Sequence, residues 1–297
     1  MRYEVVCSAD DHAAWLEARK TGIGASESPV LLGLSSFASV MELWGQKRGL
    51  IPLAGEETER MRWGLKLEPL VAEEYQRQTG RRLERWSALL RSKEFPYLLA
   101  TPDYLWSREE GCVPVEIKCA DFSHKSDWAD GVPRRVYYQC QHQLAVTGAP
   151  LASIGLLVGG NQFFWADVER HEAAVQAILA TCEAFWEQVA KGILPSVDGT
   201  ERTSQALKLI FPRAALGEVL TLPDDACRWS ADLESAKEEA KALDMKIRLL
   251  EDTLKAAIGN AEIGILPDGS GAWKWQNVHR RGYTVAETDY RQLVRMK

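Results

Sequence analysis

Two stretches of this chain decide its fold: LLATPDYLW at residues 98–106, and VPVEIKC at residues 113–119. Both are rich in apolar residues. The segment between them, residues 107–112, is polar and contains a glycine, so the two stretches are predicted to form the strands of one β-hairpin. In the second stretch apolar and polar residues alternate, which indicates one apolar face and one face that carries an acid and a base.

Folding this hairpin between Glu109 and Glu110 places Asp103 opposite Glu116, at the ~4.5–5.5 Å typical of cross-strand Cβ pairs. Two facing carboxylates repel, so a purely structural sheet would avoid this arrangement. A divalent cation removes the repulsion, and Mg²⁺ favours one or two carboxylates together with waters and phosphate oxygens. Lys118, on the same face, would activate an attacking water or stabilise charge on a phosphate. This geometry predicts metal-assisted phosphodiester hydrolysis, whereas a strand with Glu116 and Lys118 alone is more often a salt-bridged surface.

Length and composition limit the class of protein. With 297 residues, 46% of them hydrophobic and 26% charged, the chain has the size of one large domain, or one domain with an appendage, and a globular composition. No apolar run is long enough to span a bilayer, and the N-terminus lacks the apolar core of a signal peptide, so we expect a cytoplasmic protein. The net charge of −6 argues against a nonspecific nucleic-acid coat protein but allows a local basic groove.

Several common kinds of site are not indicated by the sequence. The six cysteines are scattered singly without a C-x-x-C pair, so reduced thiols are expected rather than a zinc or iron–sulfur site. The five histidines show no metal-binding spacing, and Walker loops, dinucleotide fingerprints and serine-nucleophile motifs are absent.

The first two thirds of the chain predict an α/β sandwich around one mixed sheet, with helices on its faces. The expected strands cover residues 83–91, 97–106, 113–119, 152–158 and 162–168. The expected helices lie near Trp15, near residues 28–32, and over about 40–48, 59–78, 134–147 and 170–191. Pro69 lies inside one of them and predicts a kink or restart there, while Gly80 and Gly148 are expected to end two of the helices.

Beyond Pro195 the character of the sequence changes, so we expect one domain over residues 1–195 and a C-terminal extension over residues 196–297. Apolar residues recur at alternating spacings of three and four from Leu233 to Ala257, which predicts a heptad helix over about 229–258. Such a helix must pack on its own domain, on a copy of itself or on a partner protein. We favour packing within the chain, because such seams also occur in ordinary helix pairs.

A β-hairpin is expected at about 263–285, turning at residues 267–271. Its second arm interleaves aromatic and basic residues, from Trp273 to Arg281. That pattern is compatible with contacts to nucleic acid, although a half-buried sheet with a solvated face shows it more often.

Other residues complete a candidate site. Glu68, on the long helix, would supply a metal ligand or position a water, or it is a solvated helix charge. Gln139 and Gln143 share one helix face while Gln141 points elsewhere, and any of the three is a candidate to orient a water or phosphate. In the alternative interpretation, the three glutamines only form a polar face on the surface.

A separate anion site is predicted near the N-terminus. Arg19 precedes a Gly22-Ile23-Gly24 turn and the helix that follows Ser26. Backbone N–H groups at a helix start attract anions, and a nearby arginine strengthens the attraction, so a terminal phosphate would fit there. In the alternative interpretation the glycines only make a tight turn and Arg19 forms a surface ion pair.

Together these motifs resemble the YqaJ-like viral recombinase nucleases, the lambda-exonuclease-type branch of the PD-(D/E)XK superfamily. The resemblance covers about residues 10–190. Each motif is weak, but their order and spacing are specific. The matching stretches are residues 15–19 with 22–27, Trp63-Gly64 to Glu68-Pro69, Thr101-Pro102-Asp103, Glu116-Ile117-Lys118, and Tyr138-Gln139-Cys140-Gln141 to Val146-Thr147-Gly148.

The resemblance implies a restriction-endonuclease-like core and a deoxyribonuclease that depends on Mg²⁺ or Mn²⁺. By motif match, Asp103, Glu116 and the Ile117 backbone carbonyl would hold the metal. Glu68 would be the helical acid and a candidate for a further metal ligand. Lys118 would activate or orient the attacking water. Gln139 would be the glutamine of the following helix, and Arg19 and Ser26 would bind the 5′-phosphate.

The resemblance also implies a biological setting. Members of this family that act processively digest one strand of double-stranded DNA from its 5′ end as a ring-shaped trimer, and pass the exposed strand to a phage single-strand annealing protein. We therefore expect a 5′→3′ exonuclease for phage-type recombination, encoded by a phage or prophage and acting in the bacterial cytoplasm. The extension is not part of the compact lambda-type enzyme, which puts the trimer in doubt. The alternatives are an endonuclease on the same fold, or a nuclease-fold scaffold that recruits an annealing partner.

Overall fold

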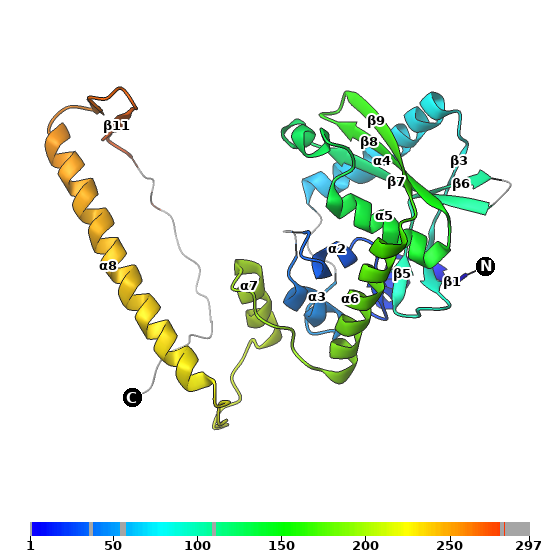
Figure 1. Ribbon diagram of the computed structural model, residues 1–297, viewed down its shortest axis with the longest axis horizontal. Helices are drawn as coiled ribbons and strands as arrows, with labels where there is room; N and C mark the ends of the chain where they lie inside the picture. Colours follow the sequence, from blue (N-terminus) through cyan, green and yellow to red (C-terminus); the bar gives the residue numbers. More distant parts are fainter. Residues whose placement is uncertain (1, 36–37, 54–57, 109–110, 280–281, 283–297) are drawn as a thin grey trace. The chain divides into compact units, whose positions relative to one another are not determined.

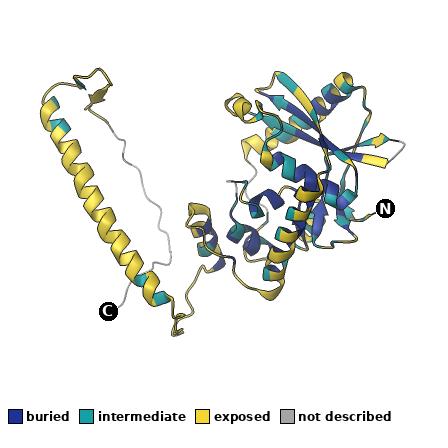
Figure 2. Ribbon diagram, in the orientation of Figure 1, coloured by how far each residue is buried: buried dark blue, intermediate teal, exposed yellow. Residues whose placement is uncertain are grey.

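The structure, a computed structural model, describes residues 2–35, 38–53, 58–108, 111–279 and 282 of the chain. It divides into two compact units, Met1–Pro212 and Arg213–Lys297 (Figure 1). Dark blue buried residues gather in the first unit, where the sheets meet the helices (Figure 2). The first unit therefore holds the hydrophobic core.

The larger sheet of the first unit has five strands in the order β3-β6-β7-β8-β9. Strands β7 and β8 run parallel and the other neighbours run antiparallel. This confirms the predicted α/β fold class with a mixed sheet. The strands are β3 (Leu83–Arg85), β6 (Tyr104–Arg108), β7 (Gly111–Ala120), β8 (Leu151–Val158) and β9 (Gln162–Glu169).

A second sheet has four strands in the order β1-β4-β5-β2. These strands are β1 (Tyr3–Ser8), β2 (Ile23–Gly24), β4 (Ala88–Ser92) and β5 (Leu98–Ala100). The prediction of uninterrupted strands over 83–91 and 97–106 was wrong, because each stretch crosses from one sheet to the other. Pro102 lacks an N–H group and cannot continue a ladder, so the chain turns there, and the backbone N–H of Trp86 donates to the carbonyl of Asp103 at 3.0 Å.

Two helices cover opposite faces of the larger sheet, α4 (Glu59–Thr79) and α5 (Arg134–Thr147). One buried cluster joins α4 to one face of β7 through Val71, Ala72, Tyr75, Val115 and Ile117. Another joins α5 to the opposite face through Val136, Cys140, Leu144 and Ile154. Because side chains alternate along a strand, Glu116 and Lys118 of β7 point toward the α5 side.

The remaining helices of the first unit are α1 (His12–Arg19), α2 (Ser28–Leu31), α3 (Val40–Lys47), the 3₁₀ helix η1 (Phe122–Trp128), α6 (Glu172–Lys191) and α7 (Glu201–Ile210). Helix α4 continues through Pro69, so the restart allowed for at that proline does not occur. As predicted, α4 and α5 end at Gly80 and Gly148, whose φ angles of 70° and 73° lie in the left-handed region that favours glycine.

Helix α7 extends the first unit past the boundary expected at residue 195. Its residues Ala206 and Ile210 are buried in the same cluster as Trp44 and Ile51. Ile210 lies so close to Gly45 that a Cβ there would come within 3.2 Å of it. Burial of this short amphipathic helix against α3 moves the boundary to Pro212.

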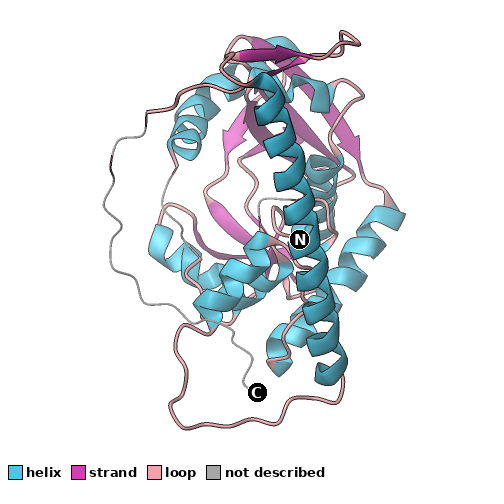
Figure 3. Cartoon of the chain, turned by 90° about the vertical axis from the view of Figure 1, so that its left-hand side faces the viewer, coloured by secondary structure: helices cyan, strands magenta, loops and turns pink. Residues whose placement is uncertain are grey.

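The described residues of the second unit form α8 (Ala226–Ile258), β10 (Ile263–Ile265) and β11 (Ala272–Lys274). Helix α8 is a single uninterrupted helix (Figure 3), and it covers the residues predicted for the heptad helix. The hairpin is present over residues 263–274, while residues 280–281 and 283–285 of its predicted second arm lie outside the described residues. Within the described part of the chain, no helix combines the length and apolar character needed to cross a bilayer.

Candidate active site

The hairpin formed by β6 and β7 has the register predicted from the sequence. Tyr104 pairs with Val115 and Arg108 pairs with Gly111, so the next step along β6 brings Asp103 opposite Glu116. Asp103 itself has left the strand, and its Oδ2 accepts a hydrogen bond of 2.8 Å from the backbone N–H of Ile117. Its carboxylate is therefore tied to β7 between Glu116 and Lys118.

Glu116 is the centre of a hydrogen-bonded cluster. The residue is only 4% exposed, and both of its carboxylate oxygens are engaged. Oε1 accepts from the Lys118 ammonium and from Gln139 Nε2, the latter at 2.5 Å, while Oε2 accepts from Gln143 Nε2 at 2.6 Å. A buried carboxylate held by one cation and two amides is fixed in orientation, as a metal ligand requires.

The electrostatics of the cluster favour a cation. Burial raises the pKa of Asp103 well above its ordinary value, and the neighbouring Glu116 carboxylate raises it further against the opposing effect of Lys118. Burial lowers the pKa of Lys118, but Glu116 and Asp103 outweigh that effect and raise it. The ammonium of Lys118 therefore only partly balances two neighbouring carboxylates, and additional positive charge beside Asp103 would relieve their repulsion.

The donor set fits a hard divalent ion. Asp103 and Glu116 offer carboxylate oxygens, and the Oε1 oxygen of Gln143 is buried without a hydrogen-bond partner. Mg²⁺ takes one or two carboxylates and completes its shell with waters and phosphate oxygens. Among the described residues there is no group of three or more His, Cys, Asp or Glu side chains that could hold a metal ion.

The structure distinguishes the three glutamines of α5. Gln139 and Gln143 both face Glu116. Gln141 points away, donating to the carbonyl of Glu169 at 2.6 Å and accepting from the N–H of His171 at 2.9 Å. The resemblance implied Gln139 alone, whereas Gln143 faces Glu116 as well, as its spacing of four from Gln139 on one helix face had allowed.

Glu68 on α4 lies near the same cluster. Its side chain is half-buried. Burial raises its pKa, Glu116 acts in the same direction, and Arg85 and Lys118 oppose them. Glu68 therefore belongs to the electrostatic environment of Glu116 rather than to a solvated helix face.

Arg19 and Ser26 lie on either side of the β2 turn. Arg19 Nη2 pairs with Glu27 Oε1 at 2.5 Å, and Lys47 Nζ pairs with Glu27 Oε2 at 2.6 Å. Burial opposes ionisation of Glu27, but Lys47 and Arg19 outweigh it and lower its pKa to about 2. Two cations thus share one carboxylate and leave an excess of positive charge. Ser26, next to this group, is exposed.

A chain of contacts connects Arg19 with the approach to Asp103. The Arg19 guanidinium lies 4.7 Å from the centre of the Trp15 ring. The indole N–H of Trp15 donates to Thr101 Oγ1 at 3.2 Å, two residues before Asp103. The basic group and the carboxylate cluster are therefore held in one framework.

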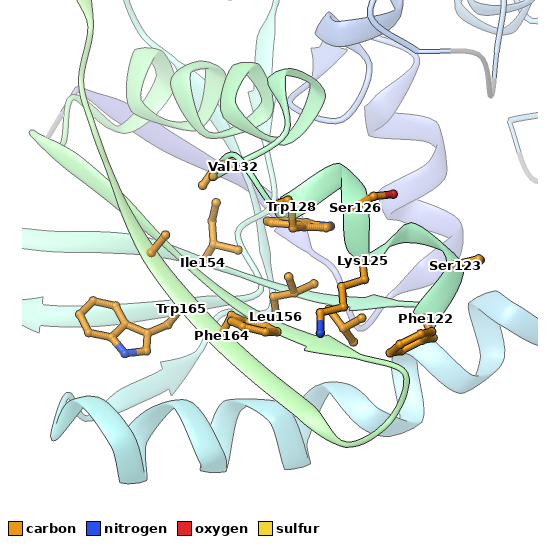
Figure 4. Close-up of a pocket in the computed structure, with 14 residues that line it drawn as sticks. Phe122, Ser123, Lys125, Ser126, Trp128, Val132, Ile154, Leu156, Phe164 and Trp165 are labelled. Atoms are coloured by element: carbon orange, nitrogen blue, oxygen red, sulfur yellow. The ribbon is translucent and has the colours of Figure 1, made fainter.

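An apolar pocket of about 700 Å³ lies between η1 and the strands β8 and β9. Phe122, Lys125 and Trp128 of η1 line one side, and Leu156 and Phe164 of β8 and β9 line the other (Figure 4). Leu156 pairs with Lys118 in the β7–β8 ladder, and paired residues of neighbouring strands project from the same face. The pocket therefore opens on the face of the sheet that carries Glu116 and Lys118, and no feature of the sequence had indicated it.

Comparison with known proteins shows what this part of the chain resembles. Residues 14–150 match the model of the YqaJ-like viral recombinase domain. Its match runs from α1 to the end of α5 and contains each of the candidate residues, from Arg19 to Gln143. The predicted resemblance is thereby confirmed, and the C-terminal extension lies outside the matched range.

Individual proteins show the same relationship. Protein YqaJ of Bacillus subtilis (strain 168), described as uncharacterized, is 28% identical over 264 residues, which cover 88% of this chain and 82% of that protein. The crystal structure of an alkaline exonuclease, LHK-Exo from Laribacter hongkongensis, is similar with a TM-score of 0.51 and 23% identity, covering 61% of this chain and 94% of that one. The structure of LHK-Exo in complex with dAMP gives the same values. These similarities show that the first unit has the restriction-endonuclease-like fold.

Proposed function

We propose that this protein is a metal-dependent DNA nuclease, and specifically a 5′→3′ exonuclease that acts on double-stranded DNA in phage-type recombination. The observation that carries the proposal is the arrangement of Asp103, Glu116 and Lys118 on one hairpin, with Gln139 and Gln143 fixing Glu116. The YqaJ-like viral recombinase domain and the fold shared with an alkaline exonuclease support the same reaction class.

In this proposal Asp103, Glu116 and the Ile117 carbonyl hold Mg²⁺ or Mn²⁺, with Glu68 as a further candidate. The ion, when bound, polarises a phosphate oxygen and acidifies a water. Gln139 and Gln143 keep the Glu116 carboxylate in one orientation. Lys118, charged beside two carboxylates, orients the attacking water and neutralises charge that develops on the phosphate.

The groups around the cluster suit a DNA end. Arg19, with Ser26 beside it, would bind a terminal 5′-phosphate, because Glu27 balances only one of the two cations that contact it. The apolar pocket beside Lys118 would receive bases that have left the duplex, since bases stack on aromatic rings such as those of Trp128 and Phe164 without regard to sequence.

The test is digestion of linear duplex DNA that carries a 5′-phosphate and a label at one end, with Mg²⁺, with Mn²⁺ or with EDTA, beside a covalently closed circle. We expect metal-dependent loss of the linear DNA from its 5′ end, with the circle spared. Cleavage of the circle would replace the exonuclease by an endonuclease. Full activity in EDTA, or in a folded Lys118→Ala variant, would contradict the assigned chemistry.

A further inference from the structure

Within the described residues of the second unit, nothing covers the heptad seam of α8. No residue of this helix is buried, and exposed residues follow its whole length (Figure 2). Five large apolar side chains of the seam, Trp229, Leu233, Leu243, Ile247 and Leu250, are between 44% and 58% exposed. An apolar stripe of this length on one helix marks an interaction surface, and a heptad spacing marks another helix as the partner.

Seven-residue periodicity assigns every seam residue to position a or d, the two core positions of a coiled coil. Counting from Leu233 as an a position, Glu239 and Lys246 occupy g positions beside the seam, and Lys237 and Asp244 occupy e positions. The a positions are Ala226, Leu233, Ala240, Ile247 and Leu254, and the d positions are Trp229, Ala236, Leu243, Leu250 and Ala257.

We propose that α8 pairs with α8 of a second copy of this chain as an antiparallel two-stranded coiled coil. In an antiparallel pair an a residue of one helix faces a d residue of the other. One register aligns the two helices end to end and fills every layer. Its layers are Trp229 with Leu254, Leu233 with Leu250, Ala236 with Ile247, Ala240 with Leu243, and Ala226 with Ala257.

The packing of the layers favours this orientation. In the antiparallel register Ala236 faces Ile247 and Ala240 faces Leu243, so both alanines in the middle of the seam meet a large residue, and two small residues meet only in the end layer of Ala226 and Ala257. In a parallel, in-register pair each residue faces itself. Two successive alanine layers would then lie next to layers of leucine, and close packing along the seam would be lost.

The charges that flank the seam also favour the antiparallel orientation. In an antiparallel pair, g positions face g positions and e positions face e positions. Glu239 then lies beside Lys246 of the second copy, and Lys237 beside Asp244, each contact occurring twice by symmetry. A parallel pair would place Asp232 beside Lys237 and Lys246 beside Glu251, but also Glu239 beside Asp244, two like charges, so only the antiparallel pair has no repulsive contact at these positions.

Glu239 and Lys246 are well suited to test the pairing. Neither has an oppositely charged residue three or four positions away on its own helix, so reversing their charges changes few contacts within α8. Glu238, next to Glu239, occupies the outward f position and provides a control for the same change of charge; unlike Glu239 it has an oppositely charged residue, Lys241, three positions away on its own helix.

The experiment is sedimentation equilibrium of the full-length chain at low salt, which measures mass and therefore does not depend on nuclease activity. We expect wild type to self-associate. Glu239→Lys and Lys246→Glu should each weaken association about tenfold, because two attractive contacts become repulsive. The double variant Glu239→Lys/Lys246→Glu should restore it, and Glu238→Lys should leave it unchanged.

Each contrary result overturns the proposal. A wild-type chain that stays monomeric shows that the seam is covered within its own chain or by a different protein. Tighter association of Glu239→Lys identifies a parallel pair, in which that lysine would face Asp244. Equal effects of Glu239→Lys and Glu238→Lys, or no rescue in the double variant, place self-association on another surface.

Discussion

Replacing Glu27 by glutamine should destabilise the first unit severely. The carboxylate of Glu27 accepts from Lys47 Nζ at 2.6 Å, from Arg19 Nη2 at 2.5 Å and from the N–H of Gly24 at 2.7 Å. The Lys47 side chain is 0% exposed, so Glu27→Gln leaves its ammonium group buried without a counter-charge. Breaking a buried ion pair by removing one partner costs about 3–5 kcal/mol.

The two pKa shifts of the pair place the cost near the lower end of that range. The pKa of Glu27 falls from 4.5 to about 2, which corresponds to about 3 kcal/mol. The pKa of Lys47, however, is lowered, because burial outweighs the effect of Glu27. Burying the ammonium thus offsets part of what the carboxylate gains. We therefore expect Glu27→Gln to lower the free energy of unfolding by about 3 kcal/mol, the lower end of the range for a broken buried ion pair.

The assay is urea denaturation of the full-length chain at pH 7, followed by near-ultraviolet circular dichroism. Glu17→Gln is the matched control, because Glu17 also pairs with a lysine but its side chain is 71% exposed, and exposed pairs contribute about 0–1 kcal/mol. Adding Lys47→Met to Glu27→Gln removes the unpaired charge and should recover part of the loss. A cost below about 1 kcal/mol for Glu27→Gln, or no recovery in the double variant, would refute this reasoning.

The pH dependence of stability provides a second test of the same pair. The folded-state pKa of Glu27 is depressed, to about 2, so its contribution is present above the unfolded pKa of about 4.5 and is lost as pH falls toward 2. Between pH 7 and pH 3 wild type should lose about 2 kcal/mol through this group. The gap between wild type and Glu27→Gln should narrow by the same amount, and a gap independent of pH would contradict the shift.

Three further predictions concern the candidate active site. Gln143→Ala should reduce metal-dependent cleavage by about tenfold or more while the protein stays folded, because loss of a partner that orients a metal ligand costs about 10–100-fold in metal affinity or activity. Gln141→Ala, on the other side of α5, should reduce cleavage less. Equal effects of the two substitutions would argue against a role for Gln143. Phe164→Ala should weaken binding of single-stranded DNA in EDTA, by at least roughly fivefold from the loss of one stacked base. Trp165 also lines the pocket, but its ring lies 4.9 Å from the Arg81 guanidinium carbon, so Trp165→Ala should weaken that binding less. A larger effect of Trp165→Ala than of Phe164→Ala would contradict base stacking on Phe164. Glu68→Gln should raise the Mg²⁺ concentration needed for half-maximal activity, measured by metal titration, and an unchanged requirement would remove Glu68 from the metal environment.

The β6–β7 hairpin could be predicted from the sequence because the residues that specify it lie within one short stretch of the chain. Alternation along β7 and the position of the turn fixed the register that brings Asp103 opposite Glu116. Helical spacing likewise put Gln139 and Gln143 on one face of α5. It could not show that this face is turned toward Glu116, because that depends on how α5 packs across β7 and β8.

Long-range packing decided the remaining features. The split of strands 83–91 and 97–106 between two sheets requires β1 and β2, which come from distant parts of the chain. The pairing of Arg19 and Lys47 with Glu27 joins α1, α3 and the start of α2. The apolar pocket forms where η1 lies over β8 and β9. No periodic pattern in the sequence indicates any of these contacts.

The sequence by itself determined the elements whose signals are local: the hairpin register, the helix ends at Gly80 and Gly148, and the heptad seam of α8. Periodicity and left-handed turns are properties of neighbouring residues, so one chain read in order contains them. Only the tertiary structure decided which groups share Glu116 and which buried charges meet at Glu27. Those contacts depend on packing between elements distant in sequence, where shape and burial select one arrangement from many that the local pattern allows.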